Sequence, residues 1–161
     1  MGYYIRITES TFQLDKAFLP QAYEAMCALN KDDSLKSGRS MGTLPDGTYG
    51  LISSHFAWMH KDYPERVDSA AGVLRELGFD VEEDENGIRI TYYDSKVGDE
   101  VHFLRALAPW ATGEIEWVSE EGEQWKYVFG DGTMKEYEGY VQYREITPTV
   151  NYAEVGRVSF Y

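Results

Sequence analysis

The chain has 161 residues, a length that fits one domain, or one domain with an extra segment at an end, and that can bury a core without disulfides or metals. Its formal net charge of −13 argues against direct binding to nucleic-acid phosphates. The single cysteine, Cys27, excludes an internal disulfide, and no stretch approaches the roughly 20 apolar residues that a membrane span needs. The first residues lack a basic start followed by an apolar run, so we expect no signal peptide and a cytoplasmic protein.

In chain order, the first predicted elements are a strand and a helix. Residues 3–8 alternate apolar and polar side chains, the period-2 pattern of a strand, and this pattern can continue to Leu14. Residues 17–29 place their apolar side chains at spacings of three and four, which predicts an amphipathic helix. The following segment, 31–52, is polar and rich in glycine, so it predicts a long loop, a feature that is usually functional or mobile.

The middle of the chain alternates between helices and a hairpin. A second helix is expected over 64–78, where Gly78 is a natural residue to follow the last helical turn. The Asn86-Gly87 pair is the strongest hairpin signal in the chain and joins two predicted strands. A third helix is expected over 99–108, with Asp99 as its N-cap.

The last predicted elements are three strands of a β-meander joined by tight turns, over residues 114–118, 124–129 and 134–144. The complete order predicts an α+β fold, a mostly antiparallel sheet with about three helices packed on one face, in a ferredoxin-like arrangement. Residues 1–145 are expected to form a single α+β domain. Residues 146–161 are expected to form a C-terminal tail, with a short edge strand near its end.

The negative charge lies almost entirely in one part of the chain. Residues 76–145 contain 18 Asp and Glu against 6 Lys and Arg, a net charge of −12, whereas residues 1–75 contain 9 against 8, a net charge of −1. Several of these carboxylates alternate with apolar side chains on the meander strands, so we expect them to project from one face of the sheet. The carboxylates predicted to bind a partner are Glu82, Glu83, Asp84, Glu85, Glu114, Glu116, Glu120, Glu121, Glu123, Glu136 and Glu138.

Such an acidic face would attract a protein with a basic surface, for example a nucleic-acid-binding host protein, and tyrosines or tryptophans could anchor the contact. The alternative interpretation is a solvated surface that keeps the protein soluble. For most of the aromatic side chains, including Trp117, Trp125 and Phe129, packing within the sheet is the favoured role.

No motif for catalysis or for a cofactor is present in the sequence. The three histidines, His55, His60 and His102, and one cysteine do not form a zinc signature. Residues 82–87 imitate the first half of a calcium loop, but Tyr93 stands where such a loop needs a bidentate Glu. Phosphate-binding glycine patterns and nucleophile motifs are also missing. The sequence therefore predicts no catalytic residue, no metal and no cofactor, and it favours a protein that is not an enzyme.

Four segments, residues 1–6, 56–59, 77–87 and 116–129, carry a resemblance to known proteins. They resemble a group of uncharacterised small proteins of bacteriophages and bacteria, and the second half of the chain resembles the YubB-like ferredoxin-like domain. The resemblance covers most of residues 1–145 and is weakest in the 31–52 segment and the tail. It implies a ferredoxin-like fold and a phage or mobile-element origin, hence a location in the host cytoplasm. Its motifs are turns, caps and core aromatics, so it transfers no functional residue.

Three functions are compatible with these observations. The first is a non-enzymatic interaction protein, a phage-type acidic inhibitor that docks on a nucleic-acid-handling host or defence protein. The second is a protein that binds a small ligand or nucleotide, or an enzyme, with a pocket near the 31–52 loop and Trp58. The third is a structural or accessory protein of a mobile element that associates with itself through sheet edges.

Overall fold

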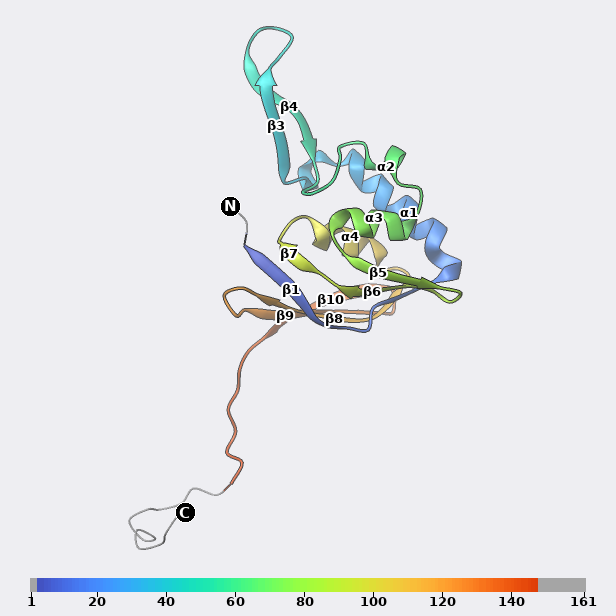
Figure 1. The fold of residues 1–161 in the computed structure, drawn as a ribbon, viewed down its shortest axis with the longest axis vertical. Coiled ribbons are helices and arrows are strands. Elements are labelled where there is room, and N and C mark those ends of the chain that lie inside the picture. The colour runs from blue at the N-terminus through green and yellow to red at the C-terminus, as the bar shows by residue number, and fades with distance from the viewer. Residues whose placement is uncertain (1–2, 148–161) are drawn as a thin grey trace, which may run out of the picture.

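The computed structural model of the chain describes residues 3–147, which form a sheet-rich α+β fold with short helices (Figure 1). The strands are β1 (Tyr4–Ser10), β2 (Gln13–Asp15), β3 (Gly38–Thr43), β4 (Tyr49–His55), β5 (Asp80–Asp84), β6 (Gly87–Tyr92), β7 (Asp94–Lys96), β8 (Ala111–Ser119), β9 (Gln124–Gly130) and β10 (Thr133–Gly139). The α-helices are α1 (Leu19–Ala28), α2 (Tyr63–Arg66), α3 (Ala70–Leu77) and α4 (Glu100–Leu107). Short 3-10 helices are η1 (Lys16–Phe18), η2 (Leu29–Lys31) and η3 (Asp33–Leu35).

Eight of the strands form one antiparallel sheet that curls like half of a barrel. Its order is β10-β9-β8-β2-β6-β5, and β1 pairs with both β7 and β8. Because Ile7 of β1 lies opposite Trp117 and Leu14 of β2 lies opposite Ala111, the β1–β2 segment runs along nearly the whole of β8. Gly113 allows a close approach within this pairing, since an added Cβ would lie 2.1 Å from the Thr11 carbonyl oxygen.

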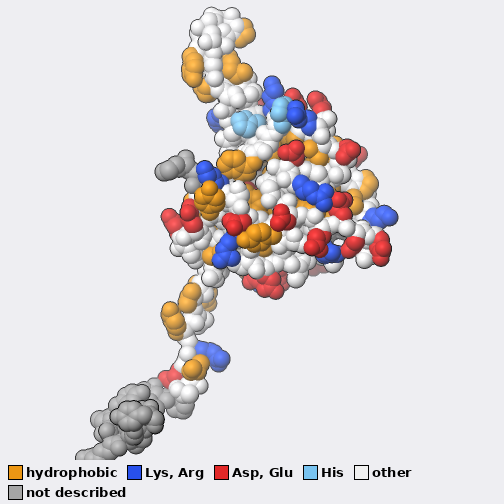
Figure 2. All heavy atoms as spheres, in the orientation of Figure 1, with side chains coloured by type: hydrophobic (Ala, Val, Ile, Leu, Met, Phe, Trp, Pro, Cys, Tyr) orange, Lys and Arg blue, Asp and Glu red, His pale blue; other side chains and the backbone are white. Residues whose placement is uncertain are grey.

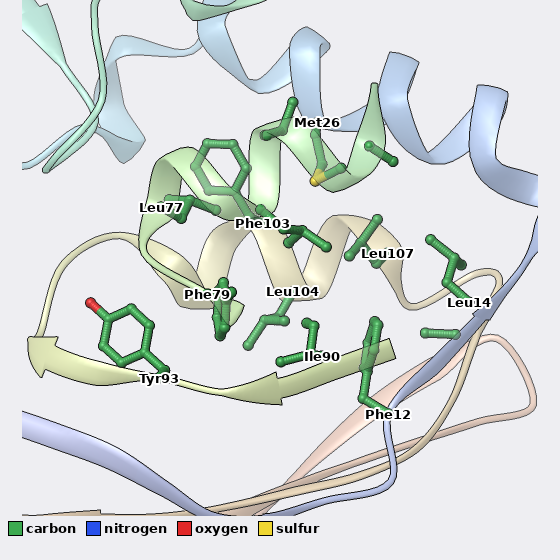
Figure 3. Close-up of a cluster of buried hydrophobic side chains, with 14 of the residues drawn as sticks. Phe12, Leu14, Met26, Leu77, Phe79, Ile90, Tyr93, Phe103, Leu104 and Leu107 are labelled. Carbon is green, nitrogen blue, oxygen red and sulfur yellow. The ribbon is translucent and has the colours of Figure 1, made fainter. Parts of the chain in front are cut away.

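The helices fill the concave side of this curled sheet, and the core lies between the two layers (Figure 3). In α4, Phe103, Leu104 and Leu107 are fully buried at helical spacings of three and four, so this helix turns one apolar face inward. From the sheet, Phe12 and Ile90 point into the same cluster. The contacts between helix and strand side chains therefore bury residues from both halves of the sequence in one core.

The predicted second helix is interrupted. Val67 has extended dihedral angles and ends α2, and α3 begins only after Ser69, whose hydroxyl oxygen accepts a hydrogen bond from the Gly72 amide at 3.0 Å. The predicted C-terminal glycine is confirmed, because Gly78 ends α3 with a φ of 109°. The sequence periodicity continued across the break because Val67 still packs against the core.

The prediction of a ferredoxin-like fold with three helices packed on one face of the sheet is wrong. Residues 3–147 contain ten strands, a curled sheet and four short α-helices. A bulge near Thr8 and the bend between β1 and β2 give the first predicted strand two sets of partners, with β7 and β8 first and with β6 and β8 afterwards. Alternation of side chains does not reveal such a change of partner.

The segment predicted as a 31–52 loop contains 3-10 turns, β3 and the first part of β4, which extends to His55. Its turn is closed by the Asp46 carboxylate, which accepts hydrogen bonds from the amide and hydroxyl groups of Thr48 at 3.0 and 2.6 Å. The hairpin stands away from the rest of the molecule (Figure 1). Trp58, which was expected to line a pocket near this segment, is half exposed beside the hairpin with a φ of 69°.

The last meander strand ends at Gly139, earlier than the sequence pattern suggests, and residues 140–147 continue as extended chain without strand pairing. The edge strand expected near the end of the chain lies outside the described residues.

Candidate functional site

The predicted acidic surface is divided between two ends of the sheet. Residues 82–85 lie at the β5–β6 turn, next to Asp15 of β2, and β2 in turn pairs with the beginning of β8. Residues 120–123 follow the end of β8, whose nine residues span about 27 Å. These two groups of carboxylates therefore cannot form one contact surface with each other.

The meander strands also divide their carboxylates between two faces. Glu114 and Glu116 lie on the outer face of the sheet, away from the helices, because Ile115 between them is fully buried. Glu116 lies opposite Lys126, and Lys126 lies opposite Tyr137, so all three side chains share that face.

Glu136 and Glu138 lie on the opposite face. They pair with Tyr127 and Trp125, which stand on the same side of the sheet as the core residue Trp117. The expectation that the meander carboxylates project together from one face is therefore wrong for this pair. Which side chains of β10 face the helices depends on the register between β10 and β9, and the alternation within a single strand does not determine that register.

Five of the predicted carboxylates form salt bridges with the protein's own cations. The pairs are Glu82 and Asp84 with Arg89, Glu83 with Arg75, Glu114 with Lys126, and Glu136 with Arg105. Hydrogen bonding from the Arg89 guanidinium lowers the pKa of the Asp84 carboxyl below its ordinary value. Although exposed pairs of this kind add little stability, they reduce the field that these groups present to a partner.

The β8–β9 turn keeps its carboxylates available. Glu120, Glu121 and Glu123 form no salt bridge with a Lys or Arg side chain within residues 3–147. The Ser119 hydroxyl oxygen shapes this turn by accepting hydrogen bonds from the amides of Glu121 and Glu123, at 3.3 and 3.1 Å. The Glu120 carboxylate accepts the amide of Tyr4 at 2.9 Å and so ties the turn to β1.

A hollow of about 380 Å³ opens beside this turn. Its aromatic walls are Tyr3, Trp125 and Tyr140, and its carboxylates are Glu123 and Glu138. The pairing of strands assembles it, because β10 places Glu138 directly opposite Trp125 of β9. We call these five residues the aromatic–acidic pocket.

The ring of Trp125 is supported by a buried aromatic neighbour. This ring stacks on that of the buried Trp117, with the ring centroids 6.1 Å apart and the planes 4° from parallel. The acidic field also reaches Tyr3, whose phenol pKa is raised above its ordinary value, first by partial burial and then by the charges of Glu123, Glu121 and Glu120. Of the residues that the structure describes, neither a Lys nor an Arg lines the hollow, so none of the described basic side chains neutralises these charges there.

This combination suits an organic cation. The faces of Tyr and Trp rings attract ammonium and guanidinium groups, and carboxylates form charge-assisted hydrogen bonds with the same groups. The side chains of Arg and Lys carry both a cation and an apolar stem, and a hollow with aromatic walls can bury that stem.

A second hollow, of about 480 Å³, lies on the outer face of the meander and is lined by charged side chains of both signs, Arg6, Glu116, Lys126 and Glu138. The Lys126 ammonium lies 3.1 Å from the Glu114 carboxylate and 5.9 Å from the centre of the Tyr137 ring. A hydrogen bond to Glu9, together with partial burial, raises the pKa of the Glu116 carboxyl. Because this hollow mixes both signs of charge, it does not indicate a class of ligand.

The sequence identified the acidic turn but not the aromatic part of the site. Trp125 was assigned to sheet packing, and Tyr3 and Tyr140 were not singled out. The one available signal was the alternation of aromatic and charged residues in 124–129, which leaves a tryptophan at the exposed end of a strand. The proximity of Tyr3 to Trp125 depends on sheet order, and a single sequence does not contain it.

Comparison with protein families, with curated proteins and with solved structures found no match to this chain. The resemblance noted from the sequence therefore stays a prediction. In residues 3–147, no group of three or more His, Cys, Asp or Glu side chains is arranged to hold a metal ion. None of the helices in this range combines the length and apolar character needed to cross a membrane.

Proposed function

We propose that this chain is a non-enzymatic interaction protein that binds a basic segment of a partner protein in the aromatic–acidic pocket. The observation that carries this proposal is the convergence of three aromatic rings and two carboxylates on one hollow that no Lys or Arg within residues 3–147 lines. An Arg or Lys side chain of the partner would enter the hollow, and the turn carboxylates at 120–123 would contact neighbouring basic residues.

The expected strength of such a contact comes from several modest contributions. A cation over an aromatic ring contributes roughly 0.5–2 kcal/mol, depending on how far it is desolvated. The stacking of Trp125 on Trp117 fixes one wall before binding, which reduces the ordering cost of association. The net charge of −13 increases the rate of encounter with a basic partner at low ionic strength.

The phage-type inhibitor is the specific form of this proposal. Proteins that handle nucleic acids carry basic clefts, and an acidic protein that occupies such a cleft would compete with the nucleic acid. The general proposal requires only that the partner present Arg or Lys side chains on an accessible segment.

The test is a titration of the protein into fluorescein-labelled hexa-arginine and hexa-lysine peptides, followed by fluorescence anisotropy. Binding is expected at 0.1 M salt, and the affinity should fall at least tenfold at 1 M, where the Debye length is only about 3 Å. A labelled hexa-glutamate peptide should not bind. Absence of binding to both basic peptides at low salt would overturn the proposal.

Two double variants separate the pocket from the general negative charge. Glu123→Gln/Glu138→Gln removes two charges from the pocket, and Glu85→Gln/Asp131→Asn removes two charges from turns outside it. The first variant should weaken binding at least tenfold and the second by less than threefold. Equal weakening by both would show that net charge, and not the pocket, governs binding.

A further inference from the structure

The β3–β4 hairpin, residues 38–55, forms a projecting arm with an unusual number of exposed apolar side chains. Met41, Leu51 and Ile52 have exposed fractions of 51, 42 and 52%, and Tyr49 reaches 74%. Figure 2 shows these apolar side chains on an arm that stands clear of the charged body. Surface patches of this kind mark sites of protein association.

Apolar side chains lie on both faces of the arm. Met41 lies directly opposite Leu51, so their side chains share one face. On the other face Gly42 and Gly50 lack side chains, and Ile52 and Leu44 lie across them, within 3.2 and 3.0 Å of where a Cβ would stand. A hairpin on the surface of a monomer would normally turn one polar face to water, whereas in this arm the polar pair Ser40 and Ser53 lies toward the base and the outer part carries apolar side chains on both faces.

The arm also has two unpaired edges. Within the described part of the chain, β3 and β4 form a sheet of two strands and pair only with each other. A hairpin of two strands is marginally stable in water, and exposed edges are usually protected by Lys or Pro side chains. Neither Lys nor Pro occurs in β3 or β4, and the one charged residue there, Arg39, lies at the base. The free edge of β3 therefore lacks Lys, Pro and a bulge, three of the features that keep an edge from pairing.

The base of the arm is nevertheless fixed to the body. The Asp99 carboxylate is 5% exposed, and its Oδ2 atom accepts hydrogen bonds from the Ser37 amide at 3.1 Å, the Ser37 hydroxyl at 2.9 Å and the Ala57 amide at 2.8 Å. These donors stand immediately before β3 and two residues after β4. One buried carboxylate thus holds both ends of the arm, which is displayed in a defined direction.

The charge distribution favours a second copy of the arm, and not the acidic body, as the surface that the arm contacts. Residues 31–66 contain five acidic and five basic residues, so the arm and its surroundings are neutral, while the rest of the chain carries 23 acidic and 10 basic residues, a net charge of −13. Two copies of the acidic body repel each other. The arm is about 20 Å long, more than twice the Debye length of about 8 Å at physiological salt. Contact through the arms therefore joins two copies while their acidic bodies remain screened from each other.

We infer that the arm pairs with the arm of a second copy of this chain. The free β3 edges would lie antiparallel about a two-fold axis and form a sheet of four strands, β4-β3-β3-β4. The β3 edge is favoured over the β4 edge because the bulge at Ile52 interrupts the regular spacing of β4. This dimer does not depend on the aromatic–acidic pocket, which contains no residue of the arm.

Sedimentation velocity of the full chain over about 5–200 µM tests this inference. A reversible dimer is expected, with a dissociation constant between about 1 and 100 µM because the contact area is small. Its affinity should rise severalfold from 0.1 to 1 M salt, since screening weakens the repulsion between bodies. Binding of basic peptides should respond to salt in the opposite direction. A wild-type chain that stays monomeric at 200 µM and 1 M salt overturns the dimer and leaves the pocket proposal untouched.

Met41→Glu/Leu51→Glu should weaken the dimer at least tenfold, whereas Lys135→Glu, which lowers the net charge by the same two units on β10, should weaken it less than threefold. If the double variant does not fold, a shortened arm replaces it, with Ser40 joined to Ser53 by Asn-Gly, since these two serines already lie opposite each other. The shortened chain should be monomeric and should still bind basic peptides. Dimerisation of the shortened chain with wild-type affinity would also overturn the inference.

Discussion

Replacing Asp99 with alanine should both destabilise the protein and loosen the arm. The carboxylate accepts three hydrogen bonds from Ser37 and Ala57 while it is 5% exposed, and bonds to a charged acceptor contribute roughly 1.5–3 kcal/mol each. The substitution leaves two backbone amides without an acceptor in a partly buried place. Because the three bonds share one oxygen and are not additive, we expect a loss of about 3–5 kcal/mol in the free energy of unfolding.

Urea denaturation provides the measurement, with Ser37→Ala as the control. That variant removes only the hydroxyl donor, so it should cost about 1 kcal/mol. Both variants should shift the midpoint without changing the slope. In Asp99→Ala, amide hydrogen exchange should accelerate across residues 38–55 more than in α4. If Asp99→Ala is as stable as Ser37→Ala, or if exchange in the arm is unchanged, the carboxylate does not hold the arm.

Two further substitutions test buried parts of the body. Burial raises the pKa of the Glu100 carboxyl, so the folded protein keeps this proton at pH values where the unfolded chain has lost it, and the free energy of unfolding falls as the pH rises through the raised pKa. Glu100→Gln removes this pH-dependent loss of stability. The difference in free energy of unfolding between the variant and the wild type should therefore increase in the variant's favour from about pH 4 to pH 7 in urea titrations. A decrease in this difference would contradict the reasoning. Gly113→Ala should lower the free energy of unfolding by more than about 3 kcal/mol, because the φ of Gly113 is 97° and the new Cβ would meet the Thr11 carbonyl oxygen. Gly122→Ala, with a φ of 89° but open space around it, should lower it by only about 1 kcal/mol. Equal losses of stability in thermal unfolding would show that the close approach at Gly113 is unimportant.

The parts of the fold that the sequence predicted are those whose signals are local. The buried stripe of α4 and the glycine that ends α3 depend on residues within a few positions of each other. The Asn86-Gly87 turn and the first two meander strands depend on equally short patterns. By contrast, the curl of the sheet depends on the different strands with which β1 and β2 pair, and the paired residues are about 70 to 115 positions apart in the sequence. Hydrophobic patterning carries no information about such distant partners.

The arm was missed for a related reason. Its strands have glycines on one face and serines near the base, a composition that is typical of a loop, and the apolar residues between them do not alternate regularly because of the bulge at Ile52. Similarly, the sequence located the acidic turn but not its aromatic neighbours. Tyr3 and Trp125 are 122 positions apart, and they line the same hollow only because β1 and β9 pair with the two edges of β8.

The aromatic–acidic pocket and the dimerising arm together predict that the protein binds an immobilised peptide more tightly than the same peptide in solution. A dimer joined through its arms carries two aromatic–acidic pockets, so a surface densely coated with arginine peptide can engage both, and binding there should exceed binding to a single soluble peptide by on the order of 10²-fold. Surface plasmon resonance at a concentration that populates the dimer measures this enhancement. Met41→Glu/Leu51→Glu should abolish it without weakening binding to the soluble peptide, and Lys135→Glu, with the same net charge, should retain it. An undiminished enhancement in the arm variant would mean that the two pockets are not linked through the arms.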